Sequence, residues 1–151
     1  MPLLIMKLIH VAAVVVFLGT IVLGIYWKAL GDRTRDPKII AHTLEGVIGA
    51  DRRLTMPSAT LLFIFGFGAQ GMGHYPIMLP WILWSIILFV ISTIAFMGFV
   101  SPTQKRMLAL MRSGNLDWNQ YEALSAKWRL WGTVALVTPI IAFVLMIVKP
   151  Q

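Results

Sequence analysis

Four long apolar stretches occupy most of this 151-residue chain and restrict the folds open to it. They cover residues 3–27, 54–72, 77–100 and 130–148, and Lys7 is the only Lys, Arg, Asp or Glu inside them. A helix of about 20 apolar residues crosses the hydrocarbon core of a bilayer, which is roughly 30 Å thick. The pattern therefore predicts an all-α fold, a four-helix transmembrane bundle that forms one integral membrane domain over residues 1–151.

The composition excludes several classes of site. Because 58% of the residues are hydrophobic, the chain is too apolar for a soluble domain. It contains no cysteine, which excludes disulfides, thiolate metal ligands, iron–sulfur clusters and covalent haem attachment. The formal net charge of +7 does not indicate nucleic-acid binding, because the cations flank the spans and cannot form a basic groove with interleaved aromatic residues.

The cations between the spans fall mainly on one side of the membrane. Residues 28–53 carry six Lys or Arg and residues 101–129 carry five, whereas residues 71–80 carry none. The positive-inside rule therefore places the first and third connections in the cytoplasm. We expect a multi-pass protein of the bacterial inner membrane with both termini periplasmic. Its expected partners are the lipid bilayer and either a second copy or another membrane subunit.

Two prolines mark local features of the predicted helices. Pro37 suits the first position of a helix, and Asp36 before it is a suitable N-cap. Pro139 predicts a kink in the last span, with Thr138 partly satisfying the freed backbone. After Pro37, five apolar residues recur at helical spacing: Ile39, Ile40, Leu44, Val47 and Ile48. This spacing predicts a short amphipathic interfacial helix between the first two spans.

Polar side chains inside a span require an explanation, because lipid-facing helices need none. One stripe of the first span, at spacings of three and four, carries Lys7, His10, Ala13, Phe17, Thr20 and Gly24. His10 is therefore expected to face the bundle interior. It could be hydrogen-bonded to a Ser, Thr or backbone carbonyl of a neighbouring helix, or its imidazole could bind a metal or haem. Lys7, one turn away, is expected to extend to the outer surface.

A second group of candidate ligands lies on the same predicted side of the membrane. The group comprises two imidazoles and three thioethers: Met6, His10, Met72, His74 and Met78. Such ligands could hold copper, particularly Cu(I). Alternatively, His10 and His74 could be the axial ligands of a b-type haem. His74 is also consistent with an ordinary turn residue. His42 belongs to the opposite side, which excludes a zinc centre built from all three histidines.

Four arginines form a candidate anion or lipid site on the cytoplasmic side, namely Arg52, Arg53, Arg106 and Arg129. In the simpler interpretation, Arg52 and Arg53 contact lipid phosphates while Asp51 pairs with one of them. No catalytic residues can be assigned, because the sequence shows no nucleophile–base pair, no phosphate-binding loop and no carboxylate pair within a span. Enzymatic activity is therefore left open.

Short motifs in a fixed order carry a resemblance over essentially the whole chain. They are Lys7-Leu8-Ile9-His10, Asp51-Arg52 with Thr55 and Pro57, Pro80-Trp81, Pro102 with Gln104 and Arg106, Tyr121 with Leu124 and Trp128, and residues 145–150. In these motifs the chain resembles an uncharacterised bacterial family of predicted integral membrane proteins, domain of unknown function 2269. That family is similar in architecture to the copper-resistance D membrane domain and to HemJ-type protoporphyrinogen oxidase. The resemblance implies that His10, with Lys7 nearby, is a haem ligand. The rest of the HemJ-type pattern is not present, so oxidase activity does not carry over.

Three functions follow as hypotheses. The leading one is a redox-associated bundle that binds haem b through His10, with His74 or a methionine opposite, for electron transfer or haem handling. The second is copper binding or transport at the outer face. The third is a non-enzymatic bundle that binds lipid or a partner subunit.

Overall fold

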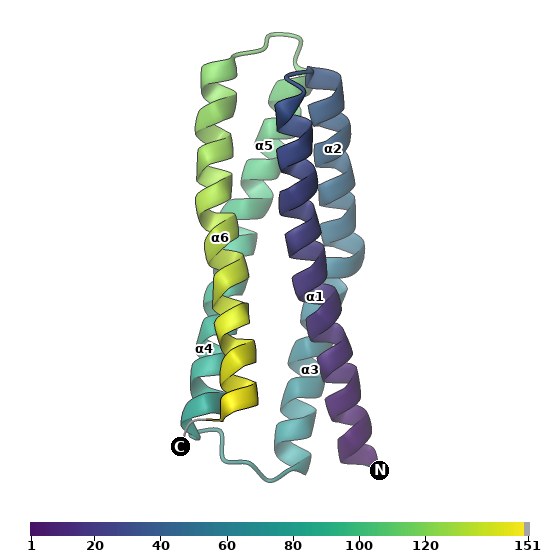
Figure 1. Ribbon diagram of the computed structural model, residues 1–151, viewed down its shortest axis with the longest axis vertical. Coiled ribbons are helices and arrows are strands. Elements are labelled where there is room, and N and C mark those ends of the chain that lie inside the picture. The colour runs from purple at the N-terminus through teal and green to yellow at the C-terminus, as the bar shows by residue number, and fades with distance from the viewer. Residues whose placement is uncertain (150–151) are drawn as a thin grey trace.

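The protein folds into long helices that run side by side (Figure 1). The computed structural model describes residues 1–149, and within them it contains no strand, which confirms the all-α prediction. Pro150, the end of the last motif, lies outside the described residues. In chain order the segments are α1 (Pro2–Arg33), α2 (Pro37–Ala50), η1 (Asp51–Thr55), α3 (Met56–Met72), α4 (Pro80–Ala95), η2 (Phe96–Val100), α5 (Ser101–Arg112) and α6 (Trp118–Val148).

The segments η1 and η2 are π-helical turns that join longer α-helices without a loop. In η1, the backbone N–H of Met56 donates to the carbonyl of Asp51, five residues earlier, and Ser101 makes the equivalent bond after η2. A proline follows directly, Pro57 or Pro102, and its missing N–H prevents a regular α-helical ladder at this point. Consequently α2, η1 and α3 form one continuous helical run, and so do α4, η2 and α5.

The connection after α1 differs from the predicted interfacial helix. Asp36 does cap α2, because its side chain accepts a hydrogen bond from the backbone N–H of Lys38, and Pro37 begins the helix. However, α2 continues directly into η1 and α3, and it packs beside α1 and α5 (Figure 1). Its apolar face is buried in protein, with Ile40 1% and Leu44 0% exposed. The helix is therefore one part of a longer helical run that packs in the bundle, and its place relative to the membrane surface stays a prediction.

Three helical segments are long and apolar enough to cross a bilayer: Pro2–Arg33, Pro80–Arg112 and Trp118–Val148. The predicted span 54–72 lies in the run of α2, η1 and α3, which is not among these three segments, so a fourth crossing stays a prediction. The 32 residues of α1 extend over about 48 Å at 1.5 Å per residue, which exceeds the roughly 30 Å hydrocarbon core. The helices are thus long enough to project beyond one face of the bilayer.

The last helix passes through Pro139 without ending. A proline deprives the carbonyl four residues earlier, here that of Ala135, of its helical partner. The Ser92 hydroxyl of α4 donates to this carbonyl at 2.7 Å, whereas Thr138 donates to the carbonyl of Val134 at 2.8 Å. The expectation that Thr138 satisfies the freed carbonyl is therefore wrong, and the bond from Ser92 instead joins α4 to α6.

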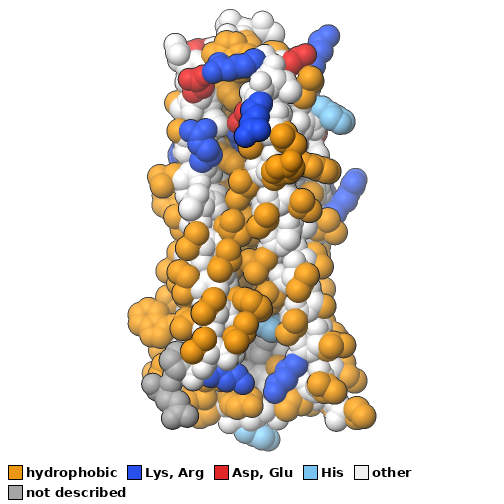
Figure 2. All heavy atoms as spheres, in the orientation of Figure 1, with side chains coloured by type: hydrophobic (Ala, Val, Ile, Leu, Met, Phe, Trp, Pro, Cys, Tyr) orange, Lys and Arg blue, Asp and Glu red, His pale blue; other side chains and the backbone are white. Residues whose placement is uncertain are grey.

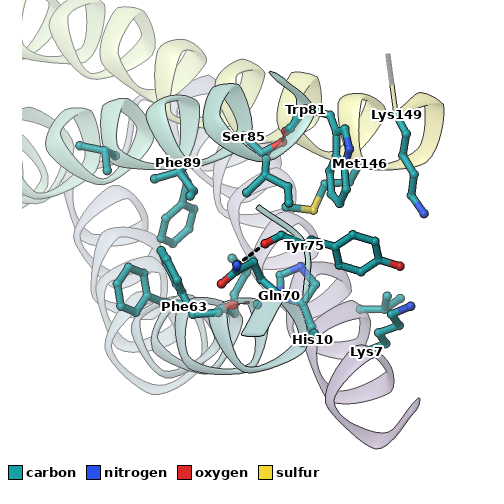
Figure 3. A pocket seen from close by; sticks show the side chains of 18 residues that line it. Lys7, His10, Phe63, Gln70, Tyr75, Trp81, Ser85, Phe89, Met146 and Lys149 are labelled. Atoms are coloured by element: carbon teal, nitrogen blue, oxygen red, sulfur yellow. Dashed lines mark hydrogen bonds between the residues drawn. The ribbon is translucent and has the colours of Figure 1, made fainter. Parts of the chain in front are cut away.

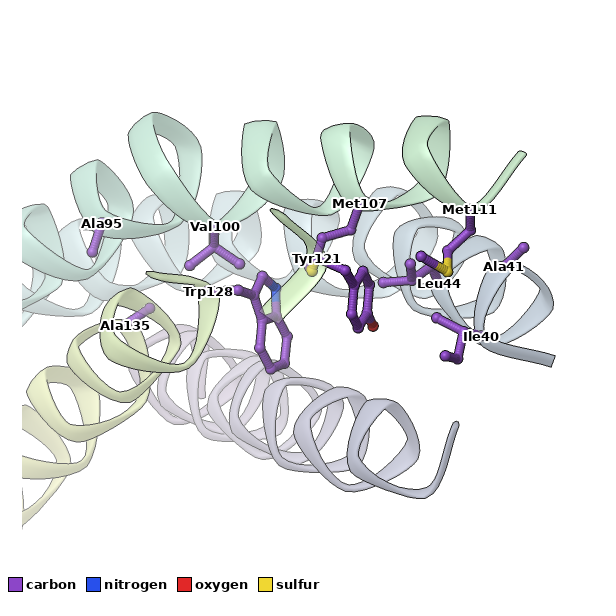
Figure 4. Packing of buried hydrophobic residues seen from close by; sticks show 10 residues of the cluster. All are labelled: Ile40, Ala41, Leu44, Ala95, Val100, Met107, Met111, Tyr121, Trp128 and Ala135. Carbon is purple, nitrogen blue, oxygen red and sulfur yellow. The ribbon is translucent and has the colours of Figure 1, made fainter. Parts of the chain in front are cut away.

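The two ends of the bundle are built differently. We call the end that holds the first residues of α1 and the 73–79 connection the terminal end, and the end that holds the 34–36 and 113–117 connections the basic end (Figure 1). The acidic side chains visible in Figure 2 all gather at the basic end, and an apolar surface extends below them. Here α2, α5 and α6 enclose the main hydrophobic core (Figure 4), which includes Ile40, Leu44, Met107, Met111, Tyr121 and Trp128.

Toward the terminal end the helices form two pairs, α1 with α3 and α4 with α6. Within the described residues, α3 packs closely against α1 but not against α4 or α6. The pairs are joined at the basic end instead, where α2 packs on α5 and α6 packs on both α1 and α5. The fold therefore leaves space between the pairs on the side of the termini.

Candidate functional site

A cavity of about 280 Å³ lies between the two helix pairs near the terminal end (Figure 3). Residues of α1, α3, α4 and α6 form its walls, and Tyr75 of the 73–79 connection completes them. The ring centroids of Phe17 on α1 and Phe89 on α4 lie 5.9 Å apart. Most of the lining is apolar, including Val11, Leu62, Phe63, Phe67, Ile82, Ile86, Phe89, Val90 and Met146.

His10 is the imidazole in this cavity wall (Figure 3). Its Nδ1 lies 2.9 Å from the carbonyl oxygen of Leu62 on α3. Since a carbonyl only accepts, Nδ1 carries the proton in this bond, and Nε2 keeps its lone pair. The ring fits because Gly66 faces it: a Cβ at Gly66 would lie 2.9 Å from His10 Cε1. The structure thus combines the predicted bond to a backbone carbonyl with a ring nitrogen that is free to bind a ligand.

The rim of the cavity is polar and positively charged. Lys7 Nζ lies 5.9 Å from the centroid of the Tyr75 ring, and Lys149 Nζ lies 5.6 Å from the centroid of the Trp81 ring. Gln70 donates a side-chain hydrogen bond to the backbone carbonyl of Tyr75. No Asp or Glu lies among the described lining residues. The rim therefore suits an anionic group, and the walls suit an apolar body.

The structure does not bring the other predicted ligands to this cavity. His74 is exposed on the 73–79 connection, with a left-handed φ of 53°, and it does not line the cavity. Met72 is 42% and Met78 is 74% exposed, and Met6 packs against Gly68. Among the described residues, no group of three His, Cys, Asp or Glu could hold a metal ion. Of the predicted copper ligands, only His10 therefore lines this cavity, and copper binding stays a prediction.

Met146 is a sulfur ligand candidate that the sequence analysis missed. It lines the cavity from α6, and Figure 3 shows its sulfur directed into the space above Tyr75, with His10 on the other side. The methionine lies in the middle of an apolar run, so nothing in the sequence distinguishes it from a lipid-facing side chain.

The structure places the four arginines of the candidate anion or lipid site on the surface, and that site stays a prediction. Arg52, Arg53, Arg106 and Arg129 are all exposed, and they lie on η1, α5 and α6. No described hydrogen bond or ion pair joins any of them to another residue. The simpler interpretation predicted that Asp51 pairs with Arg52 or Arg53, and this prediction is wrong. Asp51 accepts hydrogen bonds from Thr55 and Gln104 instead.

A buried polar network near the basic end was also missed. Lys28, only 2% exposed, donates to Asp32 at 2.6 Å and to Ser125 at 2.8 Å. Tyr121 donates to the same Asp32 carboxylate, and the Lys28 ammonium lies 5.0 Å from the centroid of the Trp128 ring. The sequence analysis counted Lys28 only among the cations that flank the spans. The network could have been predicted from two pairs of polar residues spaced four apart, Lys28 with Asp32 on α1 and Tyr121 with Ser125 on α6.

Comparison with protein families identifies the chain. The family model described as predicted integral membrane protein (DUF2269) matches residues 4–150, so the chain belongs to this family and is an integral membrane protein. No curated protein and no solved structure matches the chain. The similarity to the copper-resistance D domain and to HemJ-type proteins therefore stays a prediction.

Proposed function

We propose that this integral membrane protein binds a b-type haem in the cavity near its terminal end and serves electron transfer or haem handling. The observation that carries the proposal is the arrangement of His10: its Nδ1 is held by the Leu62 carbonyl, and its Nε2 is left free in an apolar cavity. Histidine ligands of metals are usually oriented by such a hydrogen bond from the second ring nitrogen.

The chemical types of the residues around the cavity suit a haem. His10 would hold the haem, Met146 is the sulfur available on the α6 side, and Lys7 and Lys149 would neutralise the two carboxylates of the haem. The bound haem would supply one-electron chemistry. The cavity volume of about 280 Å³ is smaller than a macrocycle, so haem binding would require the α1–α3 and α4–α6 pairs, which meet in the Phe17–Phe89 contact, to move apart.

We also propose four membrane crossings, with α3 as the additional one, in the inner membrane of a bacterium. The basic end would face the cytoplasm and the cavity would face the periplasm. The charge pattern supports this orientation, since the cations of residues 28–53 and 101–129 flank the connections of the basic end.

The haem proposal is tested by the absorption spectrum of detergent-purified protein. We expect a Soret band in protein that has been isolated with haem or titrated with it. His10→Ala should abolish the band, whereas the matched control His74→Ala should keep it, because His74 does not line the cavity. A wild-type protein without a Soret band before and after haem addition would overturn the proposal. Phospholipid retained in its place would favour a lipid-binding bundle, whose anionic headgroups also suit the lysines of the rim.

A further inference from the structure

Asp51 is the one acid among the described residues that has neither a basic partner nor a role as a helix cap. Of the other five, Asp32, Glu45 and Glu122 form ion pairs with Lys28, Arg112 and Arg35, and Asp36 and Asp117 cap α2 and α6. The partly buried Asp51 carboxylate accepts hydrogen bonds only from uncharged groups, at 2.9 Å from Thr55 and 3.0 Å from Gln104. A carboxylate withdrawn from water without a cation is energetically unfavourable unless it takes up a proton.

A small void adjoins this carboxyl group at the level of the two π-helical turns. Its volume is about 20 Å³, and Asp51, Gln104 and Trp128 are among the residues that line it. Trp128 is 4% exposed, and its indole Nε1 is a buried donor without a hydrogen-bond partner among the described residues. A void needs about 10–15 Å³ to hold a water molecule, and the water needs polar partners. Such a water would offer an acceptor to the unpartnered indole N–H and a donor to the Asp51 carboxylate.

We propose that one water molecule occupies this void between Trp128 and Asp51, and that Asp51 binds and releases a proton through it. In this step a hydronium ion of the solvent supplies the proton, the bound water passes one proton to a carboxylate oxygen and receives one in its place, and the uncharged acid keeps its hydrogen bonds to neighbouring groups. Burial raises the pKa of Asp51, which lies outside the predicted spans, and the hydrogen bonds from Gln104 and Thr55 lower it. Burial has the larger effect of the two.

The groups that face the void from the packed elements are uncharged apart from Asp51. They are Thr20, Ile21, Gly24 and Ile25 of α1, Val47 of α2, Phe96 and Val100 of η2, Gln104 of α5, and Trp128, Gly132 and Ala135 of α6. Lys28 lies against the Trp128 ring and is paired with Asp32, and Arg52 and Arg53 on η1 are exposed. The protonation of Asp51 is therefore expected to follow a single titration. It does not depend on a ligand in the terminal cavity.

The experiment follows the indole resonances by nuclear magnetic resonance in detergent-solubilised protein that is isotope-labelled at its six tryptophans. Trp128→Phe assigns the Trp128 signal. We expect this signal to show exchange with water and to shift with a single midpoint as the pH is changed. In Asp51→Asn the shift should be lost, whereas the control Glu122→Gln should retain it, because Glu122 lies in an exposed ion pair with Arg35.

Infrared spectroscopy gives a second measurement that does not require the Trp128 variant. The carbonyl band of protonated carboxyl groups should grow as the pH falls, and Asp51→Asn should lack the component that appears first, because burial raises the pKa of Asp51. A Trp128 signal without water exchange would overturn the bound water. A shift that is unchanged in Asp51→Asn, or an infrared titration identical in wild type and Asp51→Asn, would overturn the proton site.

Discussion

The imidazole of His10 fits against α3 because the residue that faces it there has no Cβ. Gly66 leaves room for the imidazole, and a Cβ there would lie 2.9 Å from Cε1 and 3.0 Å from Nδ1. We predict that Gly66→Ala displaces the ring, breaks the bond to Leu62 and lowers the stability by about 1 kcal/mol. Gly71→Ala in the same helix is the control, because its Cβ would meet no atom within 4 Å. Thermal unfolding in detergent measures both variants, and equal midpoints would contradict the prediction.

The sequence predicts the direction of side chains on regular helices better than the direction of side chains on connections. Helical spacing correctly places His10 toward the interior, because a helix fixes the direction of each side chain. His74 could not be placed in the same way, since its left-handed backbone directs it independently of any period. The burial of Lys28 was missed because a terminal lysine beside aromatic residues is also typical of a membrane boundary.

The packing of α1 on α2 depends on Gly31, where the two helices approach closely. A Cβ at Gly31 would lie 2.8 Å from Oγ1 and 3.1 Å from Cβ of Thr43, a branched side chain that has little freedom to move. We predict that Gly31→Ala separates the helices and destabilises the protein by about 1–3 kcal/mol.

The same substitution elsewhere in α1 is the matched control for Gly31. Gly19→Ala introduces a Cβ with no atom within 4 Å and should stabilise the helix by up to about 1 kcal/mol. Unfolding midpoints of the two variants should therefore move in opposite directions. A stabilising Gly31→Ala would show that this contact does not limit the distance between α1 and α2.

Helix starts and apolar faces were predictable from the sequence, but the continuity of the helices was not. Asp36 and Pro37 do begin α2, as their capping pattern predicts. The sequence analysis predicted a separate span over residues 54–72, and Pro57 lies in its first turn, where proline is common. In the structure the π-helical turn η1 accommodates the missing donor, so the run continues through it. Whether a proline begins a helix or follows a π turn depends on packing that a local pattern does not contain.

The orientation of the whole molecule can be tested because the chain has no cysteine of its own. His42 and His74 are both exposed, near opposite ends of the bundle, and each can be replaced by cysteine. In intact cells we predict that a membrane-impermeant maleimide labels His74→Cys and leaves His42→Cys unlabelled until the membrane is permeabilised. The opposite result would invert the proposed topology, and labelling of both sites would contradict the separation of the two ends.

The separation of the two helix pairs has a mechanical consequence for the molecule. The pairs pack together at the basic end through the hydrophobic core and the Lys28 network, whereas near the cavity they are linked by the Phe17–Phe89 contact and by the 73–79 connection. The connection joins α3 of one pair to α4 of the other, so it spans the cavity at its outer end. The length of this connection therefore limits how far the two pairs can separate, and with it the size of a ligand that the cavity admits.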